Sequence, residues 1–331
     1  MTEATRAWRC IIAAATLIIL AVAQSAAAQS TYPAKPVRIV VPFAPGGVND
    51  LIGRRYAQEM ARVSGGAFIV ENRGGAAGTI GAVEVARAKP DGYTLLLGGT
   101  ATHVINPAAM SKPAYDAEKS FAPIGVLMLA PTGAAVHPAV PARNLKQLVA
   151  LAKAEPGKLS FGSGGTGTVT HLTGELFKKL GGVDLLHVPY KGVGPAMIDV
   201  VAGHIPVVFP TMSPGSLSYH RSGRIRLLAI CSEQRLDAAA DVPTAAQAGM
   251  PGLIVEAMIA IFAPAGTPKA IIDQLSQAQA KVVLDPGFQA FLRESGAVPV
   301  TSSSPERTAQ FLRTEIARWT PIIKATGYKV E

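Results

Sequence analysis

The sequence has few residues that could crosslink the fold or pair charges within it. Of 331 residues, two are cysteine, 6% are aromatic and 16% are charged, whereas 49% are hydrophobic. The high apolar content excludes an intrinsically disordered chain. Without the N-terminal segment, Cys231 would be the single cysteine, so no internal disulfide could form and the fold must depend on its core. Cys231 ends an apolar run at residues 225–230, where we expect a buried, unreactive thiol.

Long apolar runs are also missing, apart from one near the N-terminus. Arg6 and Arg9 precede an apolar run at residues 11–22, and three alanines at residues 26–28 form a small-residue cleavage site. The run is shorter than the roughly 20 residues that a spanning helix needs. We therefore predict a signal peptide over residues 1–28, Gln29 as the mature N-terminus, and a soluble protein in the periplasm.

Basic residues exceed acidic ones. The formal net charge is +9, and loss of Glu3, Arg6 and Arg9 with the signal peptide removes two positive charges and one negative, leaving +8. Such an excess attracts nucleic acid, anionic membranes or small anions. Export and the lack of a dense Lys/Arg stretch disfavour nucleic acid. Attraction of small anions and a simple role in solubility both stay open.

Short β-branched runs alternate with helical patterns, which predicts parallel sheets covered by helices on both faces. The predicted strands are residues 37–41, 68–70, 94–97, 159–161, 185–188, 206–209, 225–230 and 259–263. The predicted helices are residues 50–62, 80–88, 145–154, 169–180 and 195–201, with two more that begin at Pro268 and Pro305.

The mature chain, at about 300 residues, is long enough for two α/β lobes. Two stretches with Pro and Gly, residues 111–131 and 242–252, are the predicted crossings between them. Lobe 1 would then be discontinuous, with residues 129–249 as lobe 2 inserted into it. The expected lobe 1 segments are residues 29–128 and 250–331. A ligand would bind between the lobes, where loops at the carboxyl ends of parallel strands converge.

A first Gly-rich turn, residues 43–50, joins a predicted strand to a helix. Such a turn exposes backbone N–H groups at a helix start, which suits an anion. We expect the N–H groups of Gly46 and Gly47 to bind a carboxylate. A Gly47→Val change should misplace them by its bulk, and by excluding a positive φ if the site uses one. Asp50 is interpreted as an N-cap or loop brace, because its charge would repel an anion.

A second Gly-rich turn, residues 162–168, precedes the helix that carries His171. Its glycines formally match the dinucleotide pattern G-x-G-x-x-G, but an exported protein meets no pool of NAD. We instead expect N–H groups of Gly164 and Gly167, and hydroxyls such as that of Ser163, to bind a carboxylate.

Two further turns follow strands. In residues 189–195, Lys191 could supply charge and Tyr190 an amphipathic wall, although a surface lysine and a packed tyrosine fit equally well. Residues 98–103 supply two more hydroxyls.

Constellations typical of enzymes are poor. Phe161 stands where a nucleophile elbow around Ser163 needs glycine. The six histidines are scattered singly, which disfavours a zinc site. His103, His171 and His187 are interpreted as hydrogen-bonded structural residues. We expect no catalytic activity, no cofactor and no metal. An exported α/β enzyme acting on small acids is the alternative, and ligand binding without turnover would exclude it.

The sequence resembles the Bug-type, TctC-like solute-binding components of tripartite tricarboxylate transporters. The resemblance covers nearly the whole mature chain and is carried, in the right order, by residues 32–38, 41–47, 70–73, 78–81, 89–96, 154–159, 171–172, 187–192, 241–244 and 263–268.

The resemblance implies a type II periplasmic-binding-protein fold, two α/β lobes that close on a small carboxylate, and no enzymatic activity. It also implies transient contact with the transporter's membrane subunits, and we expect a monomer. Pro210 and Met258 stand where family members often carry Asp and Trp, which leaves the ligand's identity open. The predicted ligand-binding residues are Phe43, Pro45, Gly46, Gly47, Asp50, Thr100, Thr102, His103, Ser163, Gly164, Thr166, Gly167, Thr168, His171, Tyr190 and Thr211.

Overall fold

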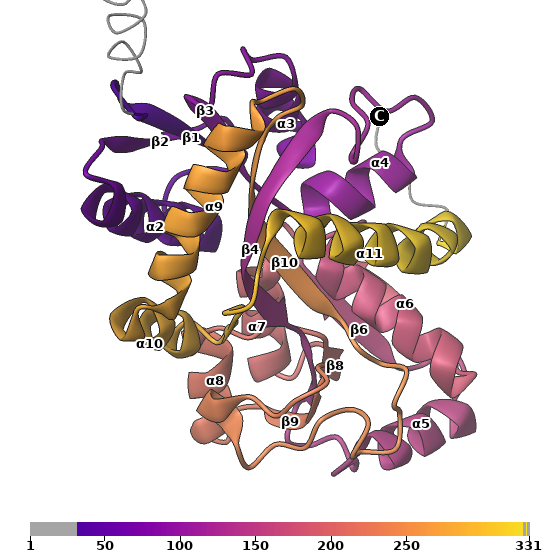
Figure 1. Cartoon of the computed structure of the whole chain (residues 1–331). Coiled ribbons are helices and arrows are strands. Elements are labelled where there is room, and N and C mark those ends of the chain that lie inside the picture. The colour runs from indigo at the N-terminus through magenta and orange to yellow at the C-terminus, as the bar shows by residue number, and fades with distance from the viewer. Residues whose placement is uncertain (1–31, 327–328, 330–331) are drawn as a thin grey trace, which may run out of the picture.

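A computed structural model describes residues 32–326 and 329, so the predicted signal peptide and Gln29 lie outside the described residues. The chain forms two β-sheets, each with helices packed against it, one above the other in the view of Figure 1. We call the six-stranded sheet with its helices lobe 1, and the five-stranded sheet with its helices lobe 2.

Lobe 1 combines strands from both ends of the described chain in the order β11-β4-β10-β3-β1-β2. β1 is parallel to β2 and β3, whereas β10 is antiparallel to β3 and β4. β1 is almost fully buried, as expected of a parallel strand covered on both faces. The strands are β1 (Val37–Val41), β2 (Phe68–Asn72), β3 (Thr94–Gly99), β4 (Phe121–Pro131), β10 (Glu256–Pro264) and β11 (Val298–Pro299). The helices are α2 (Val48–Ser64), α3 (Thr79–Ala86), α4 (Asn106–Ala109), α9 (Lys269–Leu284), α10 (Pro286–Glu294) and α11 (Pro305–Ala325).

Lobe 2 is built from one continuous stretch of chain, with strand order β7-β6-β8-β5-β9. β6 is parallel to β7 and β8, and β5 is antiparallel to β8 and β9. The strands are β5 (Gly133–Val136), β6 (Ser160–Ser163), β7 (Leu186–Pro189), β8 (Val207–Val208) and β9 (Arg226–Ile230). The helices are α5 (Leu145–Ala154), α6 (Val169–Gly181), α7 (Val193–Val201) and α8 (Pro214–Arg221).

The predicted strands and helices are present, but the stretch expected to be the first crossing is mostly a strand. Residues 121–131 form β4, which pairs with β10 along its whole length. Its proline and glycine residues interrupt the β-branched pattern by which a strand is predicted from sequence. A Cβ at Gly125 would lie 2.3 Å from the end of the Gln279 side chain, so a larger residue there would have to displace that side chain. Two register shifts in the β4–β10 pairing interrupt its regular ladder.

The chain passes between the lobes twice, at points that differ from the prediction. The first crossing is Pro131 to Gly133, and the second is Leu253 to Glu256. Residues 242–252, the predicted second crossing, instead pack along lobe 2, where Thr244 pairs with Ile230. The two crossings are tied together and to the end of β9. Thr132 N–H donates to Val255 O at 3.0 Å, Val255 N–H to Cys231 O at 2.8 Å, and Cys231 N–H to Thr132 O at 2.8 Å. The predicted lobe boundaries themselves stay a prediction.

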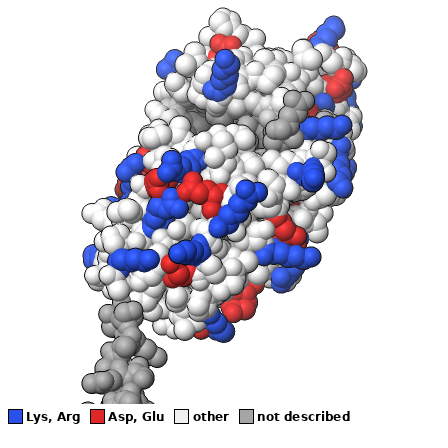
Figure 2. All heavy atoms as spheres, turned by 90° about the horizontal axis from the view of Figure 1, so that it is seen from above, with Lys and Arg blue, Asp and Glu red and all other residues white. Residues whose placement is uncertain are grey.

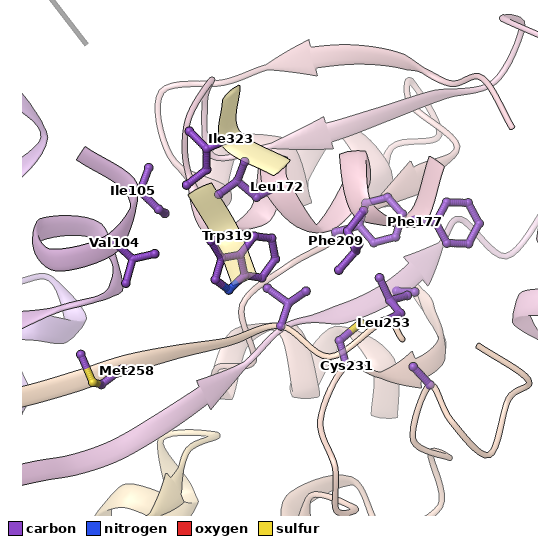
Figure 3. Close-up of a cluster of buried hydrophobic side chains, with 14 of the residues drawn as sticks. Val104, Ile105, Leu172, Phe177, Phe209, Cys231, Leu253, Met258, Trp319 and Ile323 are labelled. Carbon is purple, nitrogen blue, oxygen red and sulfur yellow. The ribbon is translucent and has the colours of Figure 1, made fainter. Parts of the chain in front are cut away.

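The hydrophobic core runs from one lobe into the other along α11. Figure 3 shows Trp319 of α11 between Val104 and Ile105 of lobe 1 on one side and Leu172 and Phe209 of lobe 2 on the other. Cys231, also in this core, is fully buried and unpaired. Burial raises the pKa of its thiol to about 12, which agrees with the predicted unreactive cysteine.

Candidate functional site

The carboxyl edges of the two sheets both lie beside the crossings. Thr100, just after β3, accepts a hydrogen bond at Oγ1 from Met258 N–H of β10, at 2.8 Å. In lobe 2, the carbonyl of Pro210, just after β8, accepts from Gly133 N–H at 2.9 Å, and Met212 N–H donates to Pro131 O at 2.8 Å. Loops that follow parallel strands gather at one edge of their sheet, so the Gly-rich loops of the two lobes extend from edges that flank the same crossings.

The lobe 1 loop, residues 43–50, is exposed and is braced by one carboxylate. Gly46 N–H donates to Asp50 Oδ2 at 2.9 Å, and Arg54 lies 3.0 Å from Asp50 Oδ1. The Asp50 side chain is buried, and the Arg54 guanidinium, followed by the Gly46 N–H, lowers the pKa of its carboxyl to about 2. Asp50 is therefore a loop brace, one of the two structural roles expected of it. The N-cap of α2 is Gly47, and no side chain caps this helix.

The backbone conformation of this loop decides which glycine has a positive φ. Gly47 has φ −79° and ψ 171°, an ordinary extended conformation, and a Cβ there would meet only Ala44 O at 3.7 Å. The positive φ belongs to Gly46, at +81°. The condition on which Gly47→Val would act through φ is therefore not met, and the position with a positive φ is Gly46. Phe43 lies deeper than the exposed Pro45 and packs close to Gly78.

Two more predicted residues of lobe 1, Thr102 and His103, have no exposed surface. Thr102 Oγ1 accepts from Gly99 N–H and lies 2.9 Å from His103 Nδ1. The His103 ring stacks on Phe262, with centroids 3.8 Å apart, and burial lowers its pKa to about 3. Both side chains thus stabilise the end of β3, and His103 is neutral at physiological pH.

The lobe 2 loop, residues 163–171, is held by its own side chains. Gly164 N–H donates to Thr170 Oγ1 at 2.9 Å, Gly165 N–H to Ser163 Oγ at 3.1 Å, and Gly167 N–H to His171 Nδ1 at 3.2 Å. Thr168 caps α6 by accepting from His171 N–H. A turn whose donors are occupied in this way is rigid before any ligand arrives.

Two stacked histidines pack against this loop. The rings of His171 and His187 lie 4.1 Å apart, and His187 Nε2 is 2.7 Å from Ser163 Oγ. Burial, with a smaller contribution from Lys178, lowers the pKa of His171 to about 4, and burial lowers that of His187 to about 4 as well. Both rings are neutral at physiological pH, so this side of the site offers dipoles rather than charge. His187 was interpreted as structural and was not among the predicted site residues, because it lies 24 positions from Ser163.

The remaining predicted residues surround this loop. Thr166 is exposed at its tip, and Tyr190 lies behind it with its hydroxyl donating to Asp199 at 2.6 Å. Burial, followed by Asp199, raises the pKa of Tyr190 to about 12. Thr211 pairs with Thr132 at the first crossing. The structure therefore brings the lobe 2 candidates together with the crossing.

Three of the four N–H groups expected to bind an anion have partners within the protein. Gly46, Gly164 and Gly167 donate to Asp50, Thr170 and His171, as described above. Gly47 N–H has no partner among the described residues. Those three donors are occupied in this structure, and their contact with a ligand stays a prediction. The uncapped first turn of α2, with Gly47 at its start, is the better candidate for direct contact with an anion. Sequence could not show this, because the competing acceptors are neighbouring side chains.

Two cavities among the described residues lie elsewhere, along α11. One of about 610 Å³ is formed by α5, α6 and α11, and another of about 530 Å³ by α4, the loop after it and α11. Of the predicted residues only His103 borders either cavity. The candidate site comprises the loops at the sheet edges, because loops that follow parallel strands gather at the edge that lies beside the crossings.

Charged side chains of both signs are interspersed on the face seen in Figure 2, which favours solubility as the role of the basic excess on that face. In residues 32–326 and 329, no three His, Cys, Asp or Glu side chains are placed to share a metal ion. No helix in the same residues is both long and apolar enough to cross a membrane.

Two α/β lobes joined by two crossings, with Gly-rich loops at adjoining sheet edges, define the class of type II periplasmic binding proteins. Residues 52–328 match the model of the tripartite tricarboxylate transporter family receptor, TctC. This chain belongs to that family.

Individual relatives agree. Protein BugT of Bordetella pertussis (strain Tohama I) is 34% identical over 307 residues, 91% of this chain and 92% of that protein. Among solved structures, the periplasmic binding protein BugD is 33% identical, with a TM-score of 0.75 over 90% of this chain and 99% of that one. R. palustris Rpa4515 with adipate is 32% identical, with a TM-score of 0.78 over 90% and 99%. MatC from Rhodopseudomonas palustris with bound malate is 32% identical, with a TM-score of 0.75 over 88% and 100%.

These findings confirm the predicted family and fold class. Binding proteins of this family are periplasmic, and the family and its structural neighbours are solute receptors rather than enzymes.

Proposed function

We propose that this protein captures a small mono- or dicarboxylic acid between its two lobes and delivers it to the membrane subunits of a tripartite tricarboxylate transporter. The observation that carries the proposal is the placement of two Gly-rich loops, residues 43–50 and 163–171, on sheet edges that flank the same crossings. The two solved structures described above, one with adipate and one with bound malate, support a dicarboxylate as the ligand class.

The chemistry of the two loops supports a carboxylate. On the lobe 1 side, Gly47 begins an uncapped helix whose first N–H groups carry partial positive charge. On the lobe 2 side, Thr166 carries an exposed hydroxyl at the tip of a loop that Ser163 and Thr168 hold by donating to Gly165 O. A carboxylate that leaves water must recover its hydrogen bonds in the site, and such donors provide them. Asp50 is no obstacle, because its charge is paired with Arg54.

The proposal includes secretion of a monomer into the periplasm, with cleavage after residue 28. The intact mass of the exported protein tests the cleavage directly. A mass that begins at Gln29 is expected, and a mass that retains residues 1–28 would contradict it.

A thermal-unfolding screen against adipate, malate and monocarboxylates tests the ligand class. An acid present at 100 times its dissociation constant should stabilise the protein by roughly 2.7 kcal/mol. Calorimetry on each hit should then give one site per chain, and incubation should return the acid unchanged. Conversion of the acid would favour the alternative, an exported enzyme, and the absence of any stabilising acid would contradict the proposed ligand class.

Binding between two lobes joined by two crossings should also move them together. Small-angle scattering should show a smaller radius of gyration with the stabilising acid than without it. An unchanged radius at saturation would contradict the hinge, unless the free protein already has the radius calculated for the closed form.

A further inference from the structure

Two buried threonine hydroxyls connect a helix of lobe 2 to the crossings between the lobes. Thr173 lies in α6, Thr132 lies in the first crossing, and neither residue has any exposed surface. Thr173 Oγ1 donates to Thr132 Oγ1 at 3.1 Å, and Thr132 Oγ1 donates to Val255 O of the second crossing at 3.2 Å. One chain of hydrogen bonds therefore runs from α6 through the first crossing to the second.

The hydroxyls lie in an apolar part of the molecule. Leu172 directly precedes Thr173 and belongs to the hydrophobic core drawn in Figure 3. Cys231, whose N–H donates to Thr132 O, belongs to the same core. When both partners of a buried hydrogen bond are replaced by apolar groups of the same shape, stability can change little. The two hydroxyls therefore contribute direction more than stability, because they fix how α6 is placed against the crossing.

The same helix holds the Gly-rich loop of lobe 2. In the first turn of α6, Thr170 Oγ1 accepts from Gly164 N–H at 2.9 Å. His171 Nδ1 accepts from Gly167 N–H at 3.2 Å. Thr173 follows three positions after Thr170 and so lies on the same side of the helix. A shift of the loop is therefore passed through one turn of helix to Thr173, and from there to the crossing.

A bond within the helix is the alternative role for this hydroxyl. Thr173 Oγ1 also lies 2.8 Å from Val169 O, four positions earlier, and threonine in a helix can donate to such a carbonyl. A hydroxyl has one hydrogen to donate, so the two bonds compete. If the bond to Val169 O were the whole role of Thr173, the crossing residue Thr132 would have no effect on the loop. This difference can be measured.

We propose that Thr173 is a positioning residue, which joins the loop at residues 163–171 and the crossings into one rigid unit. A ligand that contacts the loop then acts on the crossings directly, because buried hydrogen bonds connect each step between them. The hydroxyl pair thus couples occupation of lobe 2 to rotation about the crossings. This coupling rests on the proposed function for its ligand, whereas the rigid unit exists without one.

Hydrogen exchange of the loop amides in the ligand-free protein tests the rigid unit. Thr132→Val alters only the crossing and leaves the Thr173 hydroxyl with Val169 O as its acceptor. It should nevertheless raise the exchange rates of the Gly164 and Gly167 amides about five-fold, the size expected for loss of one hydrogen bond. Thr173→Val should raise them by a similar factor.

Three matched variants complete this test. The double variant Thr132→Val/Thr173→Val should show no faster exchange than either single variant, because both changes remove the same bond. Its chemical denaturation midpoint should agree with that of the wild type. Thr173→Ser keeps the hydroxyl and should match the wild type. Thr320→Val removes a hydroxyl that donates to Ile316 O within α11, and it should leave the loop amides unchanged.

The acid found by thermal screening tests the coupling to the ligand. In the wild type, saturation should slow the exchange of the Cys231 and Val255 amides at the crossings together with that of the loop amides. In Thr173→Val the loop amides should still respond, but the response of the crossing amides should be largely lost. The affinity of this variant should fall several-fold by calorimetry.

Three outcomes would overturn the proposal. The first is unchanged exchange of the loop amides in Thr132→Val, which would leave Thr173 with a role inside its own helix alone. The second is an additive effect in the double variant. The third is a wild-type response of the crossing amides to saturating acid in Thr173→Val. If no acid binds, the proposed function fails, while exchange in the ligand-free protein still decides whether the rigid unit exists.

Discussion

The two Gly-rich loops are alike in sequence but differ in how they are held. The lobe 2 loop uses Ser163, Thr170 and His171 to occupy three of its own N–H groups. The lobe 1 loop has one brace, Asp50, and begins an uncapped helix. The comparison shows that the backbone N–H groups of a Gly-rich turn after a strand can either be occupied by nearby side chains, which makes the turn rigid, or be left available to donate to a ligand. Which of the two occurs depends on the polar side chains in the first turn of the following helix.

The largest effect is expected from Gly165→Val in the rigid loop. Gly165 has φ +121°, and a Cβ there would lie 2.9 Å from the Tyr190 carbonyl, so both strain and a backbone clash oppose any side chain. We expect a loss of about 3 kcal/mol or more in stability and no measurable binding of the acid found by thermal screening. Gly46→Val is the matched control, because its φ is also positive but the space around it is open, and it should cost less. Chemical denaturation and calorimetry of both variants measure the difference. Equal costs would contradict the comparison.

Asp50→Asn should weaken the braced loop in a pH-dependent way. The pKa of Asp50 is lowered from 3.8 to about 2, so its stabilising contribution is present above about pH 4 and is lost as the pH falls towards 2. At about 1.36 kcal/mol per pKa unit, that contribution is about 2 kcal/mol. Denaturation midpoints of wild type and variant should differ at pH 6 and converge near pH 2. A difference that is constant with pH would show that the carboxylate charge has no part in bracing the loop.

His171→Ala removes the acceptor of Gly167 N–H from the lobe 2 loop. An unsatisfied buried donor costs roughly 1–3 kcal/mol, so affinity should fall about ten-fold through loss of loop order. His171→Asn, which places an amide oxygen near the same N–H, should recover part of the loss. Calorimetry at pH 7 is the measurement, and equal affinity of the Ala and Asn variants would argue against the acceptor role.

The smallest effect is expected from Ser163→Ala. The change removes the contact with His187 Nε2 and the acceptor of Gly165 N–H, but Thr170 and His171 still hold the loop. We expect an affinity loss of about 1 kcal/mol, several-fold, with the circular dichroism spectrum unchanged. A loss as large as that of Gly165→Val would mean that Ser163 contacts the ligand directly and that the loop is less rigid than its hydrogen bonds suggest.

Much of the fold was predictable because its strands are short, β-branched and followed by Gly-rich turns. β1 and the start of α2 follow directly from this rhythm. β4 could not be predicted, because Pro123 and Gly125 interrupt its pattern and are accommodated only by neighbours far away in sequence.

For the candidate site, the sequence predicted the two Gly-rich loops that follow β1 and β6, but it could not predict which of their N–H groups lack an internal partner. That property depends on side chains such as Thr170, whose positions relative to the loop are set only by the folded helix.

The way the crossings divide the chain also determines the order in which the sheets can be completed. Every strand of the lobe 2 sheet comes from residues 133–230, so that sheet can form from nearby segments alone. In lobe 1, β3 must wait for β10, since Gly99 pairs with Ile259, 160 positions later. Closing so long a loop is slow, and until then β3 is an open edge strand able to pair with other chains. Assembly of lobe 1 is therefore the aggregation-prone stage of folding. Early folding of lobe 2 would shorten this stage, because it brings together the two ends of residues 133–230 and with them the strands of lobe 1 that precede and follow.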